Sequence, residues 1–247
     1  MNVTEGGFKD RQLHIEDYLQ MVSAEQKEYA EVSAHQRIAE NNYIITDFQT
    51  DKLMEKILSN DNLNQAYKKV KSNKGAGGVD GMSVDELLSF LRDNGTQLKQ
   101  QLMIGKYNPN PVRRVEIPKE TKDEFRKLGI PTVVDRVFQQ AITQVLSPIY
   151  EEQFSESSFG FRPCRGAHDA LKQCQTNVND GYVYVVDMDL EKFFDTVCQS
   201  KLIEVLSRTI KDGRVISLIH KYLNAGIISR GVFERTEIGM PQGGPLS

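Results

Sequence analysis

The sequence has 247 residues, of which 39% are hydrophobic and 26% charged, and its formal net charge is −3. A chain of this length can bury a sizeable core as one large domain or two smaller ones, and none of its apolar runs approaches the roughly 18 to 20 residues of a membrane span. The composition therefore excludes a membrane-spanning protein, and the weak net charge argues against binding of nucleic acid by bulk electrostatics alone.

Residues 1–50 are polar, acidic and free of proline. Their composition suits a helix, but apolar residues recur too sparsely for a clear helical period. We interpret them as an N-terminal extension that is a helical arm, a partner-binding segment or disordered. Because its first residues lack the basic and apolar regions of a secretory signal, we expect a cytoplasmic protein.

Charge is unevenly spread along the chain. Residues 1–60 carry 6 basic and 11 acidic side chains, whereas residues 66–127 carry 13 basic and 8 acidic ones. An anionic partner is therefore expected to dock on the second block. The alternative is that these charges form a solvated surface.

A glycine-rich loop at residues 73–81 follows two short helices predicted between residues 51 and 72. It holds four glycines in nine residues, so its backbone amides can approach a phosphate closely. It is not a P-loop, because no Gly-Lys-Ser/Thr follows the glycines. A plain flexible connection is the alternative interpretation.

Residues 111–119 and 125–131 predict the two arms of a β-hairpin, because a polar turn separates an alternating polar and apolar run from a second strand-like run. Both arms carry basic residues, and Lys119 and Arg126 suit a grip on a triphosphate. Solubilising charges on an edge hairpin are the alternative. A strongly amphipathic helix beginning at Thr132 follows, and we expect it to pack as core.

The stretch Tyr182–Asp195 runs from β-branched and aromatic residues into carboxylates, which predicts a buried strand that delivers acids to one end of a sheet. Side chains alternate along a strand, so Asp187 and Asp189 are expected on one face. Two neighbouring carboxylates favour a bound cation, and oxygen ligands favour Mg²⁺. The alternative is that these acids cap the helix that follows.

Five blocks of the sequence, taken in order, resemble reverse transcriptases of the group II intron type, the intron-encoded maturases, over roughly residues 51–247. They are the glycine-rich loop, the hairpin, the Phe159–Pro163 turn, the Asp189–Asp195 motif and Pro241-Gln242-Gly243. The resemblance implies an α+β right-hand polymerase fold, with helical fingers that carry the β-hairpin at 51–180 and the first part of an antiparallel palm sheet at 181–247. It also implies RNA-directed DNA polymerase activity with an RNA template, a DNA primer and dNTPs, and binding of intron RNA as a maturase.

The same resemblance assigns site residues. Asp189, in the pattern Asp-hydrophobic-x-x-Phe-Phe-Asp, is the implied catalytic carboxylate, and with Leu190 it is assigned to a two-Mg²⁺ site. Phe194 is the implied steric gate that excludes a ribose 2′-hydroxyl. The implied nucleotide-binding residues are Lys119, Arg126, Phe193, Phe194, Gln242 and Gly243. The residues expected at the RNA or template are Lys68, Lys69, Lys71, Asn73, Lys74, Gly75, Gly77, Gly78, Arg113 and Arg114.

Two features depart from the family pattern. Thr196-Val197-Cys198-Gln199-Ser200 replaces the usual Thr/Arg-Val-Asn-His-Asp, which touches the start of a helix, and we expect no effect on the chemistry. The sequence also ends at Ser247, before the Tyr-Ala-Asp-Asp hairpin that supplies further metal-binding acids. Because a two-metal site needs acids from both strands, we expect a fragment without polymerase activity by itself.

Two further hypotheses stay open. One is an RNA-binding splicing-cofactor module without polymerisation, which the basic block at 66–127 supports. The other is a homodimer through exposed helices of the fingers or the N-terminal extension.

Overall fold

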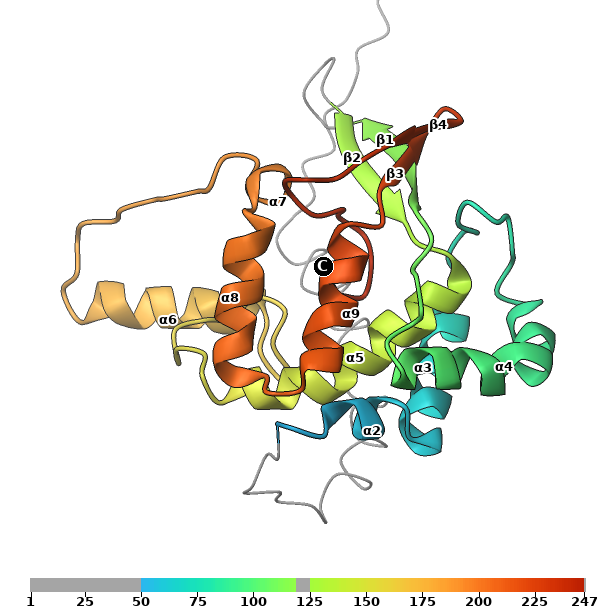
Figure 1. Cartoon of the computed structure of the whole chain (residues 1–247). Helices are drawn as coiled ribbons and strands as arrows, with labels where there is room; N and C mark the ends of the chain where they lie inside the picture. The colour runs from blue at the N-terminus through green and yellow to red at the C-terminus, as the bar shows by residue number, and fades with distance from the viewer. Residues whose placement is uncertain (1–49, 119–124, 247) are drawn as a thin grey trace, which may run out of the picture. The chain divides into compact units, whose positions relative to one another are not determined.

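The computed structural model describes residues 50–118 and 125–246, which contain eight helices and four short strands (Figure 1). The combination confirms the α+β class. None of the described helices is long and apolar enough to cross a membrane. The helices are α2 (Leu53–Ile57), α3 (Asn60–Ser72), α4 (Leu87–Met103), α5 (Val133–Glu151), α6 (Ala167–Asn179), α7 (Phe193–Thr196), α8 (Gln199–Thr209) and α9 (Gly213–Leu223). The strands are β1 (Val112–Pro118), β2 (Phe125–Ile130), β3 (Ile227–Ser229) and β4 (Val232–Glu234).

Helix α5 is the centre of the hydrophobic core, as its amphipathic pattern predicts. Its first turn is capped by Thr132, whose hydroxyl accepts a hydrogen bond from Asp135 N at 3.1 Å. Its apolar face packs against α2 and α3, where Leu53, Ile57 and Ala66 are fully or almost fully buried. Burial of this continuous apolar stripe fixes α5 as the support on which the surrounding loops are arranged.

A buried carboxylate ties the chain before β1 to the start of α5. Asp135 is 1% exposed and accepts hydrogen bonds from Tyr107 Oη and Thr132 Oγ1, both at 2.7 Å, and from Asn110 N at 3.2 Å. Burial raises the pKa of Asp135 above its ordinary value, although these hydrogen bonds oppose that rise. The cluster fixes where β1 leaves the helical layer.

The four strands form one sheet in the order β2-β1-β3-β4 (Figure 1). Strands β1 and β2 pair antiparallel from Arg113 opposite Ile130 to Pro118 opposite Phe125, which confirms the predicted hairpin. Its turn at residues 119–124, which includes Lys119, lies outside the described residues. Strand β3 pairs parallel with β1 and antiparallel with β4, and the sequence does not predict these long-range pairings.

The predicted buried strand after Tyr182 is wrong. Residues 183–191 have no strand partner and run as a loop between α6 and α7 (Figure 1). Their side chains are exposed, at 77% for Val183 and 93% for Tyr184. A strand needs a neighbour to satisfy its backbone N–H and C=O groups, and the described four-stranded sheet does not include this segment.

Candidate nucleotide and template site

Residues 236–243, which we call the C-terminal strap, cross from the end of β4 to the edge of β2. Gly129 N in β2 donates a hydrogen bond to Gln242 O at 2.7 Å, and Leu128 forms an isolated parallel bridge with Gln242. Gly129 is needed there, because a Cβ would lie 2.7 Å from Pro241 Cβ. The strap therefore places Gln242 and Gly243 beside the strand that carries Arg126.

The same strap is fastened to α7, the short helix of the predicted sugar gate. Met240 N donates to Phe194 O at 2.7 Å, and Gly239 N donates to Val197 O at 2.8 Å. The rings of Phe193 and Phe194 meet edge to face, with centroids 5.6 Å apart. Phe194 is thus hydrogen-bonded to Met240 of the strap, and Gln242 lies two residues after Met240 in the same segment.

Two cavities flank this arrangement. A polar cavity of about 60 Å³ lies between the face of the sheet and the strap, where Arg114 and Lys127 face the same space as Asp195 and Gln242. A larger cavity of about 480 Å³ has mostly apolar walls contributed by α5, α8 and α9. Arg114 and Lys127 favour an anionic group in the first cavity, whereas the carboxylate of Asp195 opposes one, and the predicted triphosphate ligand Arg126 is not among the lining residues.

The predicted metal ligands are Asp189 and Leu190, and the structure describes the loop that carries them. Asp187 and Asp189 lie on the exposed loop before α7, and the neighbouring Leu190 is 68% exposed. Within residues 50–118 and 125–246, His, Cys, Asp and Glu side chains form no group of three that could hold a metal ion. Divalent Mg²⁺ takes at least one or two carboxylates in a fixed geometry, so these described residues alone do not fit a two-metal site.

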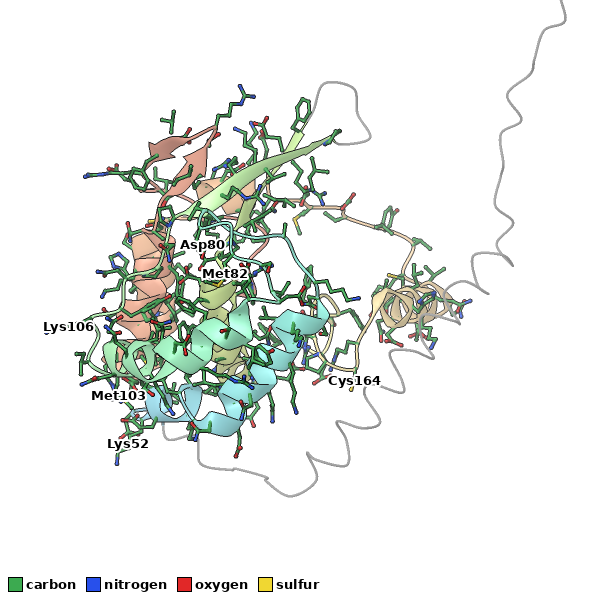
Figure 2. All side chains as sticks on the ribbon, turned by 90° about the vertical axis from the view of Figure 1, so that its right-hand side faces the viewer. Lys52, Asp80, Met82, Met103, Lys106 and Cys164 are labelled. Carbon is green, nitrogen blue, oxygen red and sulfur yellow. The ribbon has the colours of Figure 1, made fainter. Side chains whose placement is uncertain are left out.

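The glycine-rich loop is held by two arginines. Arg113 in β1 donates from Nε and Nη2 to Gly77 O at 3.1 and 2.8 Å, and Arg136 in α5 donates from Nη2 to Ala76 O at 2.8 Å. At Gly78, a Cβ would lie 2.6 Å from Thr132 Cα, so the loop packs directly on the start of α5. Figure 2 shows Asp80 and Met82, at the far end of the loop, between the sheet and the helices.

These contacts give several predicted template residues a structural partner. Arg113 is half-buried, and its guanidinium is engaged by the loop, whereas Arg114 faces the polar cavity. Gly75 approaches Arg136 closely, since its Cβ would lie 2.2 Å from Arg136 Nη1. Sequence reasoning missed Arg136, because an arginine in the first turn of a core helix carries no local signal of a loop that it would hold.

The predicted lysines lie on an exposed surface. Lys68, Lys69 and Lys71 project from α3, and Lys74 and Asn73 follow at its C-terminal end, all exposed. Lys71 Nζ lies 5.9 Å from the ring centroid of Tyr67, within the range of a cation–π contact. They therefore present a cluster of cations next to the glycine-rich loop.

Comparisons with known proteins identify the family of the chain. The family described as reverse transcriptase (RNA-dependent DNA polymerase) matches residues 117–247. The chain is 36% identical over 212 residues to the group II intron-encoded protein LtrA of Lactococcus lactis subsp. cremoris, covering 86% of this chain and 35% of LtrA. It is 38% identical over 191 residues to protein YkfC of Escherichia coli K12, covering 75% of this chain and 50% of YkfC.

Two further likenesses are weaker. Nuclear intron maturase 2, mitochondrial, of Arabidopsis thaliana is 37% identical over 98 residues, covering 40% of this chain and 13% of the maturase. A solved chain of a partial Cas6-RT-Cas1–Cas2 complex superposes with a TM-score of 0.53 at 23% identity, covering 79% of this chain and 32% of that chain, which shows the fold alone.

The matches cover only part of the length of each relative. The chain spans between about a third and a half of the length of LtrA and YkfC. The family match covers more than half of this chain, including β2, α7 and the strap. The chain belongs to the reverse transcriptase (RNA-dependent DNA polymerase) family, and within it to the group II intron type.

Proposed function

We propose that this chain is the fingers and first palm part of an RNA-directed DNA polymerase encoded by a group II intron. The observation that carries the proposal is the strap, which joins Gln242 and Gly243 to β2 and to Phe194. A nucleotide bound there would have its phosphates towards the cations of the hairpin and its sugar towards Phe194. In this proposal residues 51–180 form the fingers and 181–247 the palm part, in a cytoplasmic protein.

The assigned partners are an RNA template with a DNA primer, a dNTP and intron RNA. Arg126 and Lys119 would hold the triphosphate, and Phe193 would support the gate formed by Phe194. Asp189 and Leu190 stay the proposed ligands of Mg²⁺, which supplies charge stabilisation in phosphoryl transfer when bound. A homodimer is a further prediction, and sedimentation that finds only a monomer at tens of micromolar would count against it.

Extension of a DNA primer on an RNA template tests the polymerase proposal. We expect residues 1–247 alone not to extend the primer, because Asp189 by itself cannot complete a two-metal site. The same chain continued through its reading frame is expected to extend it, and Asp189→Ala in that longer chain is expected to abolish extension. Extension by neither wild-type chain, with binding of structured RNA by both, would favour the RNA-binding function instead.

The second candidate function is binding of structured RNA, and the exposed lysine cluster on α3 favours it. Each lysine that neutralises a phosphate releases counterions, so affinity should fall steeply with salt. We expect Lys68→Ala, Lys69→Ala, Lys71→Ala or Lys74→Ala each to reduce the slope of log affinity against log salt by about 0.7 to 0.9. Lys201→Ala, on α8 and away from this cluster, is the matched control and should leave the slope unchanged. A slope near zero in the wild type would exclude this function.

A further inference from the structure

Gln199, the first residue of α8, is a buried polar side chain that joins distant parts of the chain. It is 6% exposed, and its Nε2 lies 3.2 Å from Leu223 O, 3.2 Å from Thr236 O and 2.9 Å from Gly239 O. An amide nitrogen carries two hydrogens, so one of them is shared between two of the three carbonyls. Because a buried amide in this position satisfies several carbonyls at once, it fixes the spacing of the segments that it joins.

The three carbonyls belong to the end of α9 and to the strap. Thr236 Oγ1 also donates to Leu223 O at 2.8 Å, so the start of the strap is anchored to α9 by two side chains. From the other side, the strap is bound to α7 through the Met240–Phe194 and Gly239–Val197 hydrogen bonds. The strap is therefore held between Gln199 and α7, and only Pro241 separates Met240 from Gln242.

We propose that Gln199 is a positioning residue for the incoming nucleotide. It does not contact the nucleotide site itself, but it sets the position of the strap, and through the strap the spacing between Phe194 and Gln242. The inference rests on the proposed function, and it adds that the preference for deoxyribose over ribose depends on Gln199. Exclusion of a 2′-hydroxyl requires the gate to lie within contact distance of the sugar, so a small displacement of the strap changes the preference more than it changes overall binding.

Two substitutions separate this role from a merely structural one. Gln199→Met keeps the length and shape of the side chain but removes both N–H donors, which leaves three carbonyls without that partner. Gln199→His keeps one ring N–H donor and is expected to restore part of the effect. Gln173→Met, at an exposed glutamine of α6, is the matched control for the same chemical change.

The experiment uses residues 1–247 with an RNA template and a DNA primer that lacks a 3′-hydroxyl, so that nucleotide binding is measured without chemistry. The dissociation constants of dTTP and of 5-methyl-UTP, which has the same base and differs only in its 2′-hydroxyl, are compared in the presence of Mg²⁺, and hydrogen exchange is followed at the amides of Gly239 and Met240. We expect Gln199→Met to speed exchange at both amides by about tenfold and to reduce the preference for dTTP over 5-methyl-UTP by about the same factor. Gln199→His should lie between Gln199→Met and the wild type, and Gln173→Met should match the wild type.

The outcomes are distinguishable. If the wild-type chain does not bind dTTP on this primer–template, the role of Gln199 is overturned, whereas primer extension by the longer chain decides the proposed function separately. If the wild type binds dTTP and Gln199→Met keeps the full preference for dTTP, only the role of Gln199 is overturned, whether or not exchange has changed. If Gln199→Met does not fold, Gln199→His decides, and an unchanged preference in that variant overturns the proposal.

Discussion

Replacing Asp212 with alanine is expected to lower the free energy of unfolding by about 3 kcal/mol. Asp212 is 3% exposed and caps two helices at once. Its Oδ1 accepts a hydrogen bond from Arg214 N in α9 at 3.0 Å, and its Oδ2 accepts one from the buried Met54 N in α2 at 3.0 Å. The alanine variant leaves the Met54 amide buried without an acceptor, which is the main cost.

The guanidinium of Arg214 adds to this arrangement. It donates to both oxygens of Asp212, at 3.0 and 2.9 Å, and to both oxygens of Glu55 in α2.

Urea or thermal unfolding of Asp212→Ala and the wild type measures the loss of stability. Glu204→Ala removes an exposed carboxylate that pairs with Lys201 and Arg208, and it should leave stability unchanged. If both substitutions lowered the free energy of unfolding equally, the hydrogen bonds of Asp212 would contribute no more to stability than those of a surface carboxylate.

The same carboxylate gives the stability a pH dependence of known sign. Burial raises the pKa of Asp212, but hydrogen bonds from the Arg214 side chain and from the Met54 and Arg214 amides outweigh burial and lower the pKa below its ordinary value. A lowered folded-state pKa stabilises the protein above the unfolded value of about 3.9, and this contribution is lost as the pH falls through the folded-state pKa. The wild type should therefore lose more stability than Asp212→Asn between about pH 6 and pH 3.

The local sequence pattern is sufficient to predict an element that is stabilised by residues close in sequence. The hairpin follows from alternation in two runs joined by a short turn, and α5 follows from an apolar stripe behind a Thr132 cap. The stretch after Tyr182 is also rich in strand-favouring residues, but it has no partner within the described residues. Propensity reports that a segment fits a sheet, and only pairing decides whether a strand forms.

The site was predicted only in part for a similar reason. The resemblance assigns roles to Phe194 and Gln242; the structure places Gln242 in the strap and joins Phe194 to it by a backbone hydrogen bond. At Gln199 the sequence indicates only a change at a helix start, because the acceptors of this side chain lie 24, 37 and 40 residues further along the chain. Asp212 likewise caps a helix 158 residues before it, where Lys52 provides no side-chain cap. Such contacts exist only after folding and leave no spacing in the sequence.

Replacing Gly239 with alanine is expected to lower the free energy of unfolding by about 3 kcal/mol and to detach the strap from α7. Gly239 has a φ of +78°, and a Cβ there would lie 2.6 Å from Asp195 O and 2.8 Å from Phe194 O. These contacts are with backbone atoms, which cannot turn aside as the end of a side chain can. The strap must therefore move away from α7, and the Met240–Phe194 hydrogen bond is lost with it.

Gly231 supplies the control that separates backbone conformation from steric contact. Its φ of +82° is close to that of Gly239, but a Cβ there meets nothing within 4 Å. Gly231→Ala should cost only the left-handed conformation, about 1 to 2 kcal/mol. The additional loss in Gly239→Ala, measured by urea unfolding, then reports the close approach of the strap to α7. If both variants lower the free energy of unfolding equally, the strap can move away from α7 without loss of stability. It would then not set the spacing between Phe194 and Gln242.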